Sequence, residues 1–218
     1  MDLEYMHISY PNILLNMRDG SKLRGYFAKK YIDEEIVHNH RDNAFVYKYP
    51  QIQFKIIDRS PLIIGIGSLG INFLESKRIF FEKELIISND TNDITEVNVH
   101  KDMDHFGTTD KILKYQFKTP WMALNAKNSE IYKNSDEIDR EEFLKRVLIG
   151  NILSMSKSLG YTIEEKLKVK INLKEVPVKF KNQNMVGFRG EFYINFDIPQ
   201  YLGIGRNVSR GFGTVVKV

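Results

Sequence analysis

The sequence predicts an α+β fold made of two successive halves, each a small antiparallel sheet with helices on one face. Three observations indicate it. The 218 residues suit two domains of about 100 residues each. Hydrophobic residues make up 42% of the chain, which is enough for packed cores. Both halves show the order strand, helix, strand, strand, without a close sequence repeat. This order is typical of tandem ferredoxin-like domains, so we expect residues 1–108 and 109–218 to form one each.

In the first half, short runs of β-forming residues alternate with two helical segments. The first helix has a basic face, and Ser21 is its expected N-cap. Residues 88–110 are polar and rich in turn formers, so we place the domain boundary there. The expected helices span 21–31 and 70–75, and the expected strands span 5–10, 44–49, 51–57, 62–66 and 83–87.

The second half contains the clearest helix of the chain, over residues 139–159. Its apolar residues recur at helical spacing, and Gly160 follows as a stop signal. The lysines of 166–173 alternate with apolar residues, which favours a strand with one basic face. The expected strands of this half span 111–118, 166–173, 187–196 and 214–218.

Composition excludes several classes of function. The chain has no cysteine, which rules out disulfides, thiol catalysis and thiolate metal sites and favours an intracellular, cytoplasmic protein. No apolar run approaches the ~18 residues that span a bilayer, so we expect no membrane partner. The formal charge of +4 and the pI near 9.0 are compatible with a polyanionic partner.

A glycine-rich loop, Gly-Ile-Gly-Arg-Asn-Val-Ser-Arg-Gly-Phe-Gly, precedes the last strand. Its spacing fits neither the dinucleotide-binding fingerprint nor a phosphate loop followed by Gly-Lys-Ser/Thr. Glycines let a backbone approach a ligand closely with amides facing phosphates, and arginines add bidentate contacts. The alternative is a mobile hairpin end with solvated arginines. The loop residues that we expect to bind are Gly203, Gly205, Arg206, Arg210, Gly211 and Gly213.

This loop resembles the C-terminal glycine-rich loop of the RAMP superfamily of CRISPR proteins. Residues 23–66, which include Leu23-Arg-Gly-Tyr-Phe and His38-Asn-His-Arg-Asp, are similar to the I-B type of precursor CRISPR RNA processing endoribonuclease. The resemblance implies two RRM-like RAMP domains, CRISPR repeat RNA as substrate, and a catalytic histidine after the first helix. A CRISPR effector complex and a second copy of the chain are further candidate partners.

Two histidines one residue apart follow the first expected helix. In an extended stretch His38 and His40 point the same way, and imidazole suits proton transfer because its ordinary pKa is about 6.5. With the resemblance, we expect His40 to be a general acid or base, His38 its assistant, and Tyr47 an orienting hydroxyl. A solvated loop, a packed Tyr47 and a Zn²⁺ or Ni²⁺ pair are the alternatives, the last without a third ligand nearby.

The expected reaction is metal-independent and needs no cofactor: the 2′-oxygen attacks, leaving a 2′,3′-cyclic phosphate and a 5′-hydroxyl. Acidic clusters at 33–35 and 136–139 are expected to be helix caps or solvated faces. A non-catalytic RAMP subunit that binds guide RNA is the rival function, whereas no small-molecule motif supports a metabolic enzyme. The basic residues expected to stabilise the RNA phosphates are Lys29, Lys30, Arg41 and Lys48.

Overall fold

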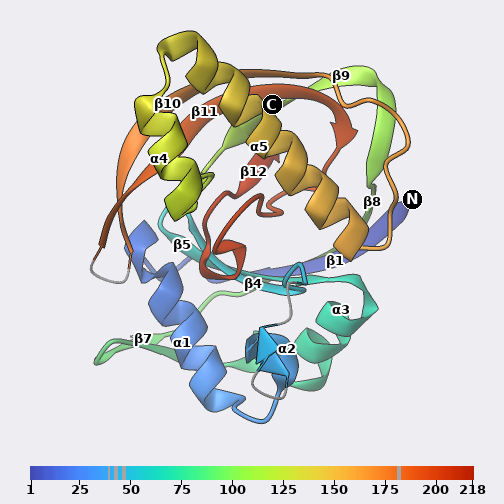
Figure 1. Cartoon of the computed structure of the whole chain (residues 1–218). Helices are drawn as coiled ribbons and strands as arrows, with labels where there is room; N and C mark the ends of the chain where they lie inside the picture. Colours follow the sequence, from blue (N-terminus) through green and yellow to red (C-terminus); the bar gives the residue numbers. More distant parts are fainter. Residues whose placement is uncertain (39, 42–43, 46–47, 181–182) are drawn as a thin grey trace. The chain divides into compact units, whose positions relative to one another are not determined.

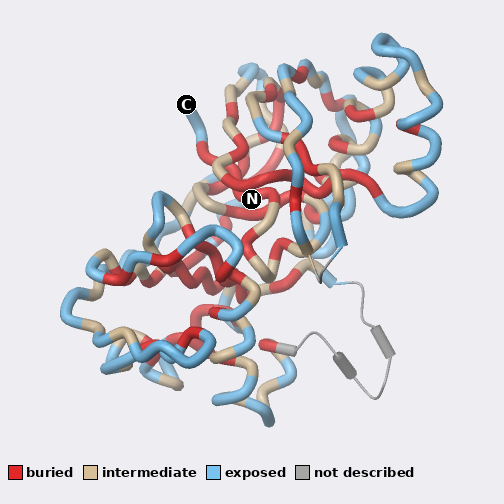
Figure 2. The backbone as a smooth tube through the Cα atoms, turned by 90° about the vertical axis from the view of Figure 1, so that its left-hand side faces the viewer, coloured by how far each residue is buried: buried red, intermediate tan, exposed pale blue. Residues whose placement is uncertain are grey.

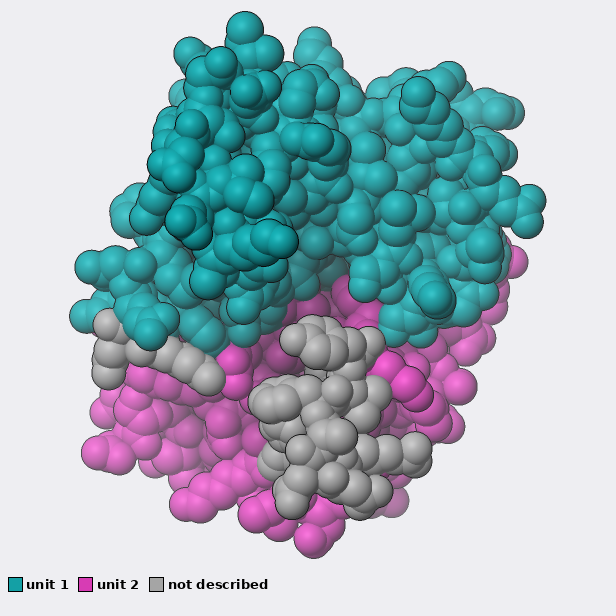
Figure 3. Space-filling model, viewed as in Figure 1, with its two compact units in different colours: residues 1, 105–207, 212–218 teal, residues 2–104, 208–211 magenta. Residues whose placement is uncertain are grey.

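The chain folds into two compact units, which are coloured teal and magenta in Figure 3. The N-terminal unit contains residues 2–104 together with 208–211, and the C-terminal unit contains residue 1, 105–207 and 212–218. A computed structural model describes the backbone of residues 1–38, 40–41, 44–45, 48–180 and 183–218, and the side chains of these residues outside 38–47.

The N-terminal unit is built on a four-stranded sheet with the order β4-β5-β1-β8. In this order the first and third strands of the unit's main sheet are neighbours, as in a ferredoxin-like βαββαβ fold. Helices α1 and α3 follow β1 and β5 in the chain (Figure 1). The sheet strands are β1 (Asp2–Ser9), β4 (Ile52–Ile57), β5 (Ser60–Ile66) and β8 (Asn98–His105), and the helices are α1 (Gly20–Lys30), α2 (Glu35–His38) and α3 (Gly67–Ser76).

Short elements connect these parts. They are the 3₁₀ turns η1 (Met17–Asp19) and η2 (Ile79–Phe81) and the strand pairs β2 (His40–Arg41) with β3 (Ala44–Phe45) and β6 (Glu84–Ile87) with β7 (Asp90–Asp93). One core joins sheet and helices: Ile8 and Phe54 from the sheet pack with Leu23 and Phe27 from α1. All four side chains are fully buried, so α1 is fixed to the sheet mainly by apolar burial.

The C-terminal unit repeats this plan with one change. Its sheet has the order β10-β11-β9-β12, and α4 and α5 lie on one face of it (Figure 1). Where a second crossover helix is expected, between β11 and β12, the chain runs through the glycine-rich loop instead. The elements are β9 (Gly107–Phe117), α4 (Ala126–Asn134), α5 (Glu137–Ser158), β10 (Val169–Phe180), β11 (Gln183–Asp197), η3 (Val208–Arg210, within the N-terminal unit) and β12 (Val215–Lys217).

Burial follows this layering. Figure 2 colours the trace by burial and shows buried residues gathered in the interior and exposed residues on the outer turns. Along β4 every residue from Ile52 to Ile56 is buried, including Gln53 and Lys55 on the face opposite the apolar core. Among the described helices, none is long and apolar enough to cross a membrane.

The α+β fold class of two sheet-based, ferredoxin-like domains is confirmed, but some local details differ from the expectations. The two units divide between Asp104 and His105, within residues 88–110, but much of this stretch is regular structure, namely β7, β8 and the start of β9. The N-cap of α1 is Asp19, so Ser21 lies inside the helix. Of the expected strand over 44–49, Ala44 and Phe45 form β3, residues 46–47 lie outside the described residues, and residues 48–49 are not in a strand.

Candidate nucleic-acid site

His38 and His40, with the short stretch of chain that carries them, are called the histidine segment below. This segment lies at the end of α2 and in β2 of the short β2–β3 pair. His38 is the last residue of α2, whereas His40 begins β2 and pairs with Phe45. His38 is in a helix and His40 is in a strand, so the two histidines do not share one extended stretch. The side chains of His38, His40 and Arg41, and Tyr47 altogether, lie outside the described residues.

Helix α2 is held to α1 by Arg24, which the sequence marks as part of the motif Leu23-Arg-Gly-Tyr-Phe but not as a contact to α2. Arg24 Nη2 donates a hydrogen bond of 2.9 Å to the carbonyl of Val37, the residue before His38. Val37 itself is buried in the core of the N-terminal unit. Arg24 follows the buried Leu23 on α1, so its position at the border of the apolar face is the signal that could have identified it.

The glycine-rich loop has two parts, and residues 208–211 belong to the N-terminal unit. The 3₁₀ turn η3 contacts α1 and β4. A Cβ on Gly20, the first residue of α1, would lie 2.8 Å from the carbonyl oxygen of Arg210, and one on Gly211 would lie 3.0 Å from that of Phe54. Glycine at both positions thus permits η3 to pack closely against α1 and β4.

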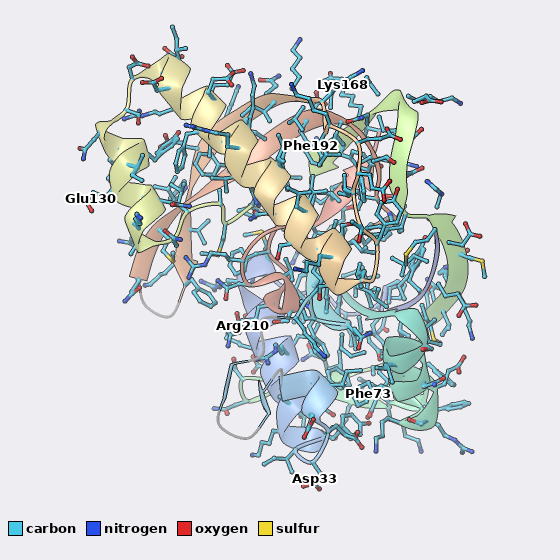
Figure 4. The ribbon with its side chains drawn as sticks, turned by 45° about the vertical axis from the view of Figure 1, so that its right-hand side comes forward. Asp33, Phe73, Glu130, Lys168, Phe192 and Arg210 are labelled. Carbon is cyan, nitrogen blue, oxygen red and sulfur yellow. The ribbon has the colours of Figure 1, made fainter. Side chains whose placement is uncertain are left out.

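This packing brings Arg210 to the helix that anchors the histidine segment. Arg210 lies beside α1 in Figure 4 and is close enough to Arg24 for their charges to interact. Burial, and then the charge of Arg210, lower the pKa of the Arg24 guanidinium; burial also lowers the pKa of Arg210. Two half-buried cations in one place create a positive potential that favours an anion such as a phosphate.

The remaining loop residues lie in the C-terminal unit, where their backbone is used internally. The amide of Gly213 donates to the carbonyl of Pro120 at 2.9 Å, and that of Ile204 donates to the carbonyl of Gly213 at 2.8 Å. Gly203 forms an isolated bridge with Thr214. In the N-terminal unit the amide of Gly211 donates to Val208. The expectation that these amides are free for phosphates is wrong for Gly211 and Gly213.

Two glycines of the C-terminal part are required by close packing. Gly205 has φ +90°, and a Cβ there would lie 2.6 Å from Trp121 Nε1. Gly213 has φ +64°, and a Cβ there would collide with the carbonyl oxygen of Ile204. Both positions disfavour any other residue. The glycines therefore allow the loop to pack closely, whereas its arginines carry the positive charge.

The predicted basic residues differ in their surroundings. Lys29 in the last turn of α1 and Lys48 are exposed. Lys30 forms an ion pair with Glu82, and its ammonium lies 5.9 Å from the centre of the Tyr26 ring. Arg206 is exposed and donates from Nη1 to the carbonyl of Leu124 at 3.0 Å within the C-terminal unit. Lys29, Lys48 and Arg206 present charge to solvent, whereas Lys30 already has a carboxylate partner.

The acidic clusters have structural roles. Asp136 caps α5, since its side chain accepts a hydrogen bond of 2.9 Å from the amide of Asp139. Glu34 forms an ion pair with Lys77. Within the described part of the chain, no three His, Cys, Asp or Glu residues are grouped closely enough to hold a metal ion.

Comparison with known proteins gives consistent matches over the whole chain. The family models "Cas6b N-terminal domain" and "Cas6b C-terminal domain" match residues 1–105 and 107–218. A crystal structure of a CRISPR RNA processing endoribonuclease Cas6b is 89% identical with a TM-score of 0.84, and another Cas6b crystal structure is 88% identical with a TM-score of 0.85. Both cover 100% of each chain.

More distant matches agree with the fold. An uncharacterized protein of Methanocaldococcus jannaschii is 52% identical over 116 residues, which are 53% of this chain and 79% of that protein. A RAMP protein binding different RNA substrates has a TM-score of 0.61 at 14% identity, covering 100% of this chain and 99% of its own. At that identity the likeness concerns the fold alone.

Proposed function

The chain belongs to the Cas6b family, and from this premise we propose that it is an endoribonuclease that cuts precursor CRISPR RNA within its repeats without a metal ion. The similarity of residues 23–66 supports the I-B branch. We propose residues 1–108 as the domain that carries the histidines and 109–218 as the domain whose sequence includes the glycine-rich loop, although residues 208–211 of that loop pack in the N-terminal unit. A homodimer and a CRISPR effector complex are the assemblies that we propose for it.

The reaction needs a base, an acid and charge stabilisation. One of His40 and His38 removes the proton from a 2′-hydroxyl, and the 2′-oxygen attacks the adjacent phosphorus. The bond to the 5′-oxygen breaks, and the other imidazole supplies the proton to this leaving group. Tyr47 orients the 2′-hydroxyl or donates to a phosphate oxygen. The products are a 2′,3′-cyclic phosphate and a 5′-hydroxyl, so no water or metal ion enters the first step.

One observation supports this site above others: residues 208–211 of the loop lie in the same compact unit as the histidine segment. Arg210 of η3 and Arg24 of α1 concentrate positive charge beside α1, and Arg24 also donates a hydrogen bond to the carbonyl of Val37, the residue before His38. A phosphate bound by this pair would be near the residues that carry the proton transfers. Lys29, Lys48 and Arg206 add solvent-facing charge, which contributes to affinity for any RNA sequence.

The chemistry of the product ends tests the proposed reaction. We expect repeat RNA cut in excess EDTA to end in a 2′,3′-cyclic phosphate and a 5′-hydroxyl, because the nucleophile is internal to the RNA. Mass spectrometry of the fragments identifies both ends. A fully 2′-deoxy repeat is the control and should bind but stay intact. A 5′-phosphate, or cutting that stops with chelator, contradicts the proposal, and binding without cutting favours the guide-RNA scaffold instead.

Replacing Arg24 tests the link between α1 and the histidine segment. We expect Arg24→Ala to lower the single-turnover rate at saturating repeat RNA about 10- to 100-fold, because loss of the bond to Val37 lets α2 shift and small misplacements of catalytic groups are costly. Arg18→Ala removes the same charge from an exposed position in η1 and is the matched control. Equal rates for the two variants, with both folded by circular dichroism, contradict the assigned role.

A further inference from the structure

The sheet of the C-terminal unit carries an aromatic ring between two lysines on the face opposite its core. Tyr193 on β11 is the Cα partner of Lys170 on β10 and of Lys114 on β9. These three residues form a row across three adjacent strands. The Lys114 ammonium lies 5.9 Å from the centre of the Tyr193 ring. Tyr193 is half-buried and Lys170 is exposed, so the row faces solvent.

Further basic residues continue this face, because side chains two apart on a strand share a side. The next residues along β10 and β11 on this side include Lys174, whose partner is Arg189, and both are exposed. Glu191 is the acidic residue here and pairs with Lys114 at 2.8 Å. The sheet face formed by Lys114, Lys170, Lys174, Arg189, Glu191 and Tyr193 is called the Tyr193 face below; it has four cations and one carboxylate.

The core of the unit does not depend on Tyr193. The neighbouring Phe192 points to the other side, is fully buried and stacks on Tyr115 with ring centres 5.3 Å apart. Helix α5 covers that side, where its buried Leu148 and Ile152 contribute to the core. An aromatic ring kept on the outer side among lysines is what stacking of an unpaired base requires, with phosphates beside it.

We propose that the Tyr193 face binds single-stranded RNA, with one base stacked on Tyr193 and neighbouring phosphates at Lys170, Lys174 and Arg189. In view of the proposed function, this RNA is the unpaired part of the precursor outside the cut phosphodiester. Stacking on a tyrosine accepts any base, so this face supplies affinity for a single strand and leaves the choice of sequence to other contacts.

Binding of a 12-nucleotide uridine RNA, measured by fluorescence anisotropy at several salt concentrations, tests this proposal. We expect Tyr193→Ala to weaken binding about tenfold and Tyr193→Phe to bind like the parent chain, because the phenyl ring still stacks. Lys170→Ala/Lys174→Ala should reduce the slope of log K against log salt by about 1.4, the contribution of two single-strand phosphate contacts. Lys127→Ala/Lys133→Ala removes two exposed lysines of α4 and should change neither quantity comparably.

Three results overturn the proposal: unchanged affinity of Tyr193→Ala, equal weakening by Tyr193→Phe and Tyr193→Ala, or equal salt slopes for the two lysine pairs. Duplex RNA of the same length should be unaffected by Tyr193→Ala, because its bases are already stacked on one another. Cleavage of repeat RNA by the parent chain is scored separately. If that cleavage fails while Tyr193→Ala still loses the uridine RNA, the proposed function is wrong and the Tyr193 face stands.

Discussion

We expect replacement of both His38, the last residue of α2, and His40 to abolish cutting of repeat RNA while binding persists. A positioned acid or base contributes roughly 10²- to 10⁴-fold to such a reaction, so His38→Ala and His40→Ala each reduce the single-turnover rate within that range. The double variant falls to the background rate, because the leaving 5′-oxygen and the 2′-hydroxyl then lack a proton donor and acceptor. Affinity stays within about threefold, since phosphate contacts dominate RNA binding.

The control for this experiment removes two histidines elsewhere. His100→Ala/His105→Ala takes two exposed imidazoles from β8 and should leave the rate close to that of the parent chain. Gel assays of cleavage with repeat RNA, and filter binding of the same RNA, separate rate from affinity. Full cutting by the His38→Ala/His40→Ala variant, or loss of binding with no separate loss of rate, means that the chemistry lies elsewhere.

The fold could be predicted where the hydrophobic pattern is clear. Helix α5 and strands β4, β5 and β11 agree with their expected positions within a few residues. Helix α5 has an apolar face at helical spacing, and β4 and β5 are short runs rich in β-forming residues that are buried almost throughout. Strand β8 was missed because nearly every residue along it is exposed, so no alternation of apolar and polar residues marks it. Helix α4 was missed for a similar reason, since Tyr132 is its buried residue.

The candidate site was predictable in its residue types but not in its contacts. The glycines of the loop signalled unusual backbone, and Gly205 and Gly213 do have positive φ. The close contacts that require glycine join Gly205 to Trp121, which is distant in sequence, and Gly213 to Ile204 at the other end of the same loop. Neither contact could be derived from the spacing of the glycines. The approach of Arg210 to Arg24 likewise depends on packing of η3 against α1, which no local pattern encodes.

The packing of residues 208–211 against β4 buries a lysine, and this burial lowers the free energy of unfolding of the protein. Lys55 on β4 is fully buried, and burial lowers its pKa to about 7. A Cβ on Gly211 would lie 3.2 Å from Lys55 Cα, so the loop segment 208–211 lies directly over this part of the strand. An ammonium that loses its water there is less stable than in the unfolded chain, where the lysine pKa is near 10.5.

This pKa difference makes stability depend on pH in a defined window. Between pH 7 and 10.5 the unfolded chain binds a proton at Lys55 that the folded chain does not, so this lysine's contribution to the free energy of unfolding rises with pH. Below pH 7 both states are protonated and the penalty, roughly 3–5 kcal/mol, is fully present; above 10.5 it vanishes. The other lysines and tyrosines titrate as well, so a variant must isolate the effect.

The Lys55→Met variant isolates the contribution of Lys55 to the pH dependence of stability. We expect the free energy of unfolding of Lys55→Met minus that of the parent chain to fall by about 1.4 kcal/mol per pH unit from pH 7.5 to 10, because only the parent gains stability from the neutral amine. Urea denaturation followed by circular dichroism at four pH values measures the difference. Lys48→Met, at an exposed lysine, should show no such slope. A constant difference between Lys55→Met and the parent chain at all four pH values would mean that Lys55 keeps an ordinary pKa in the folded protein, and that residues 208–211 leave it in contact with water.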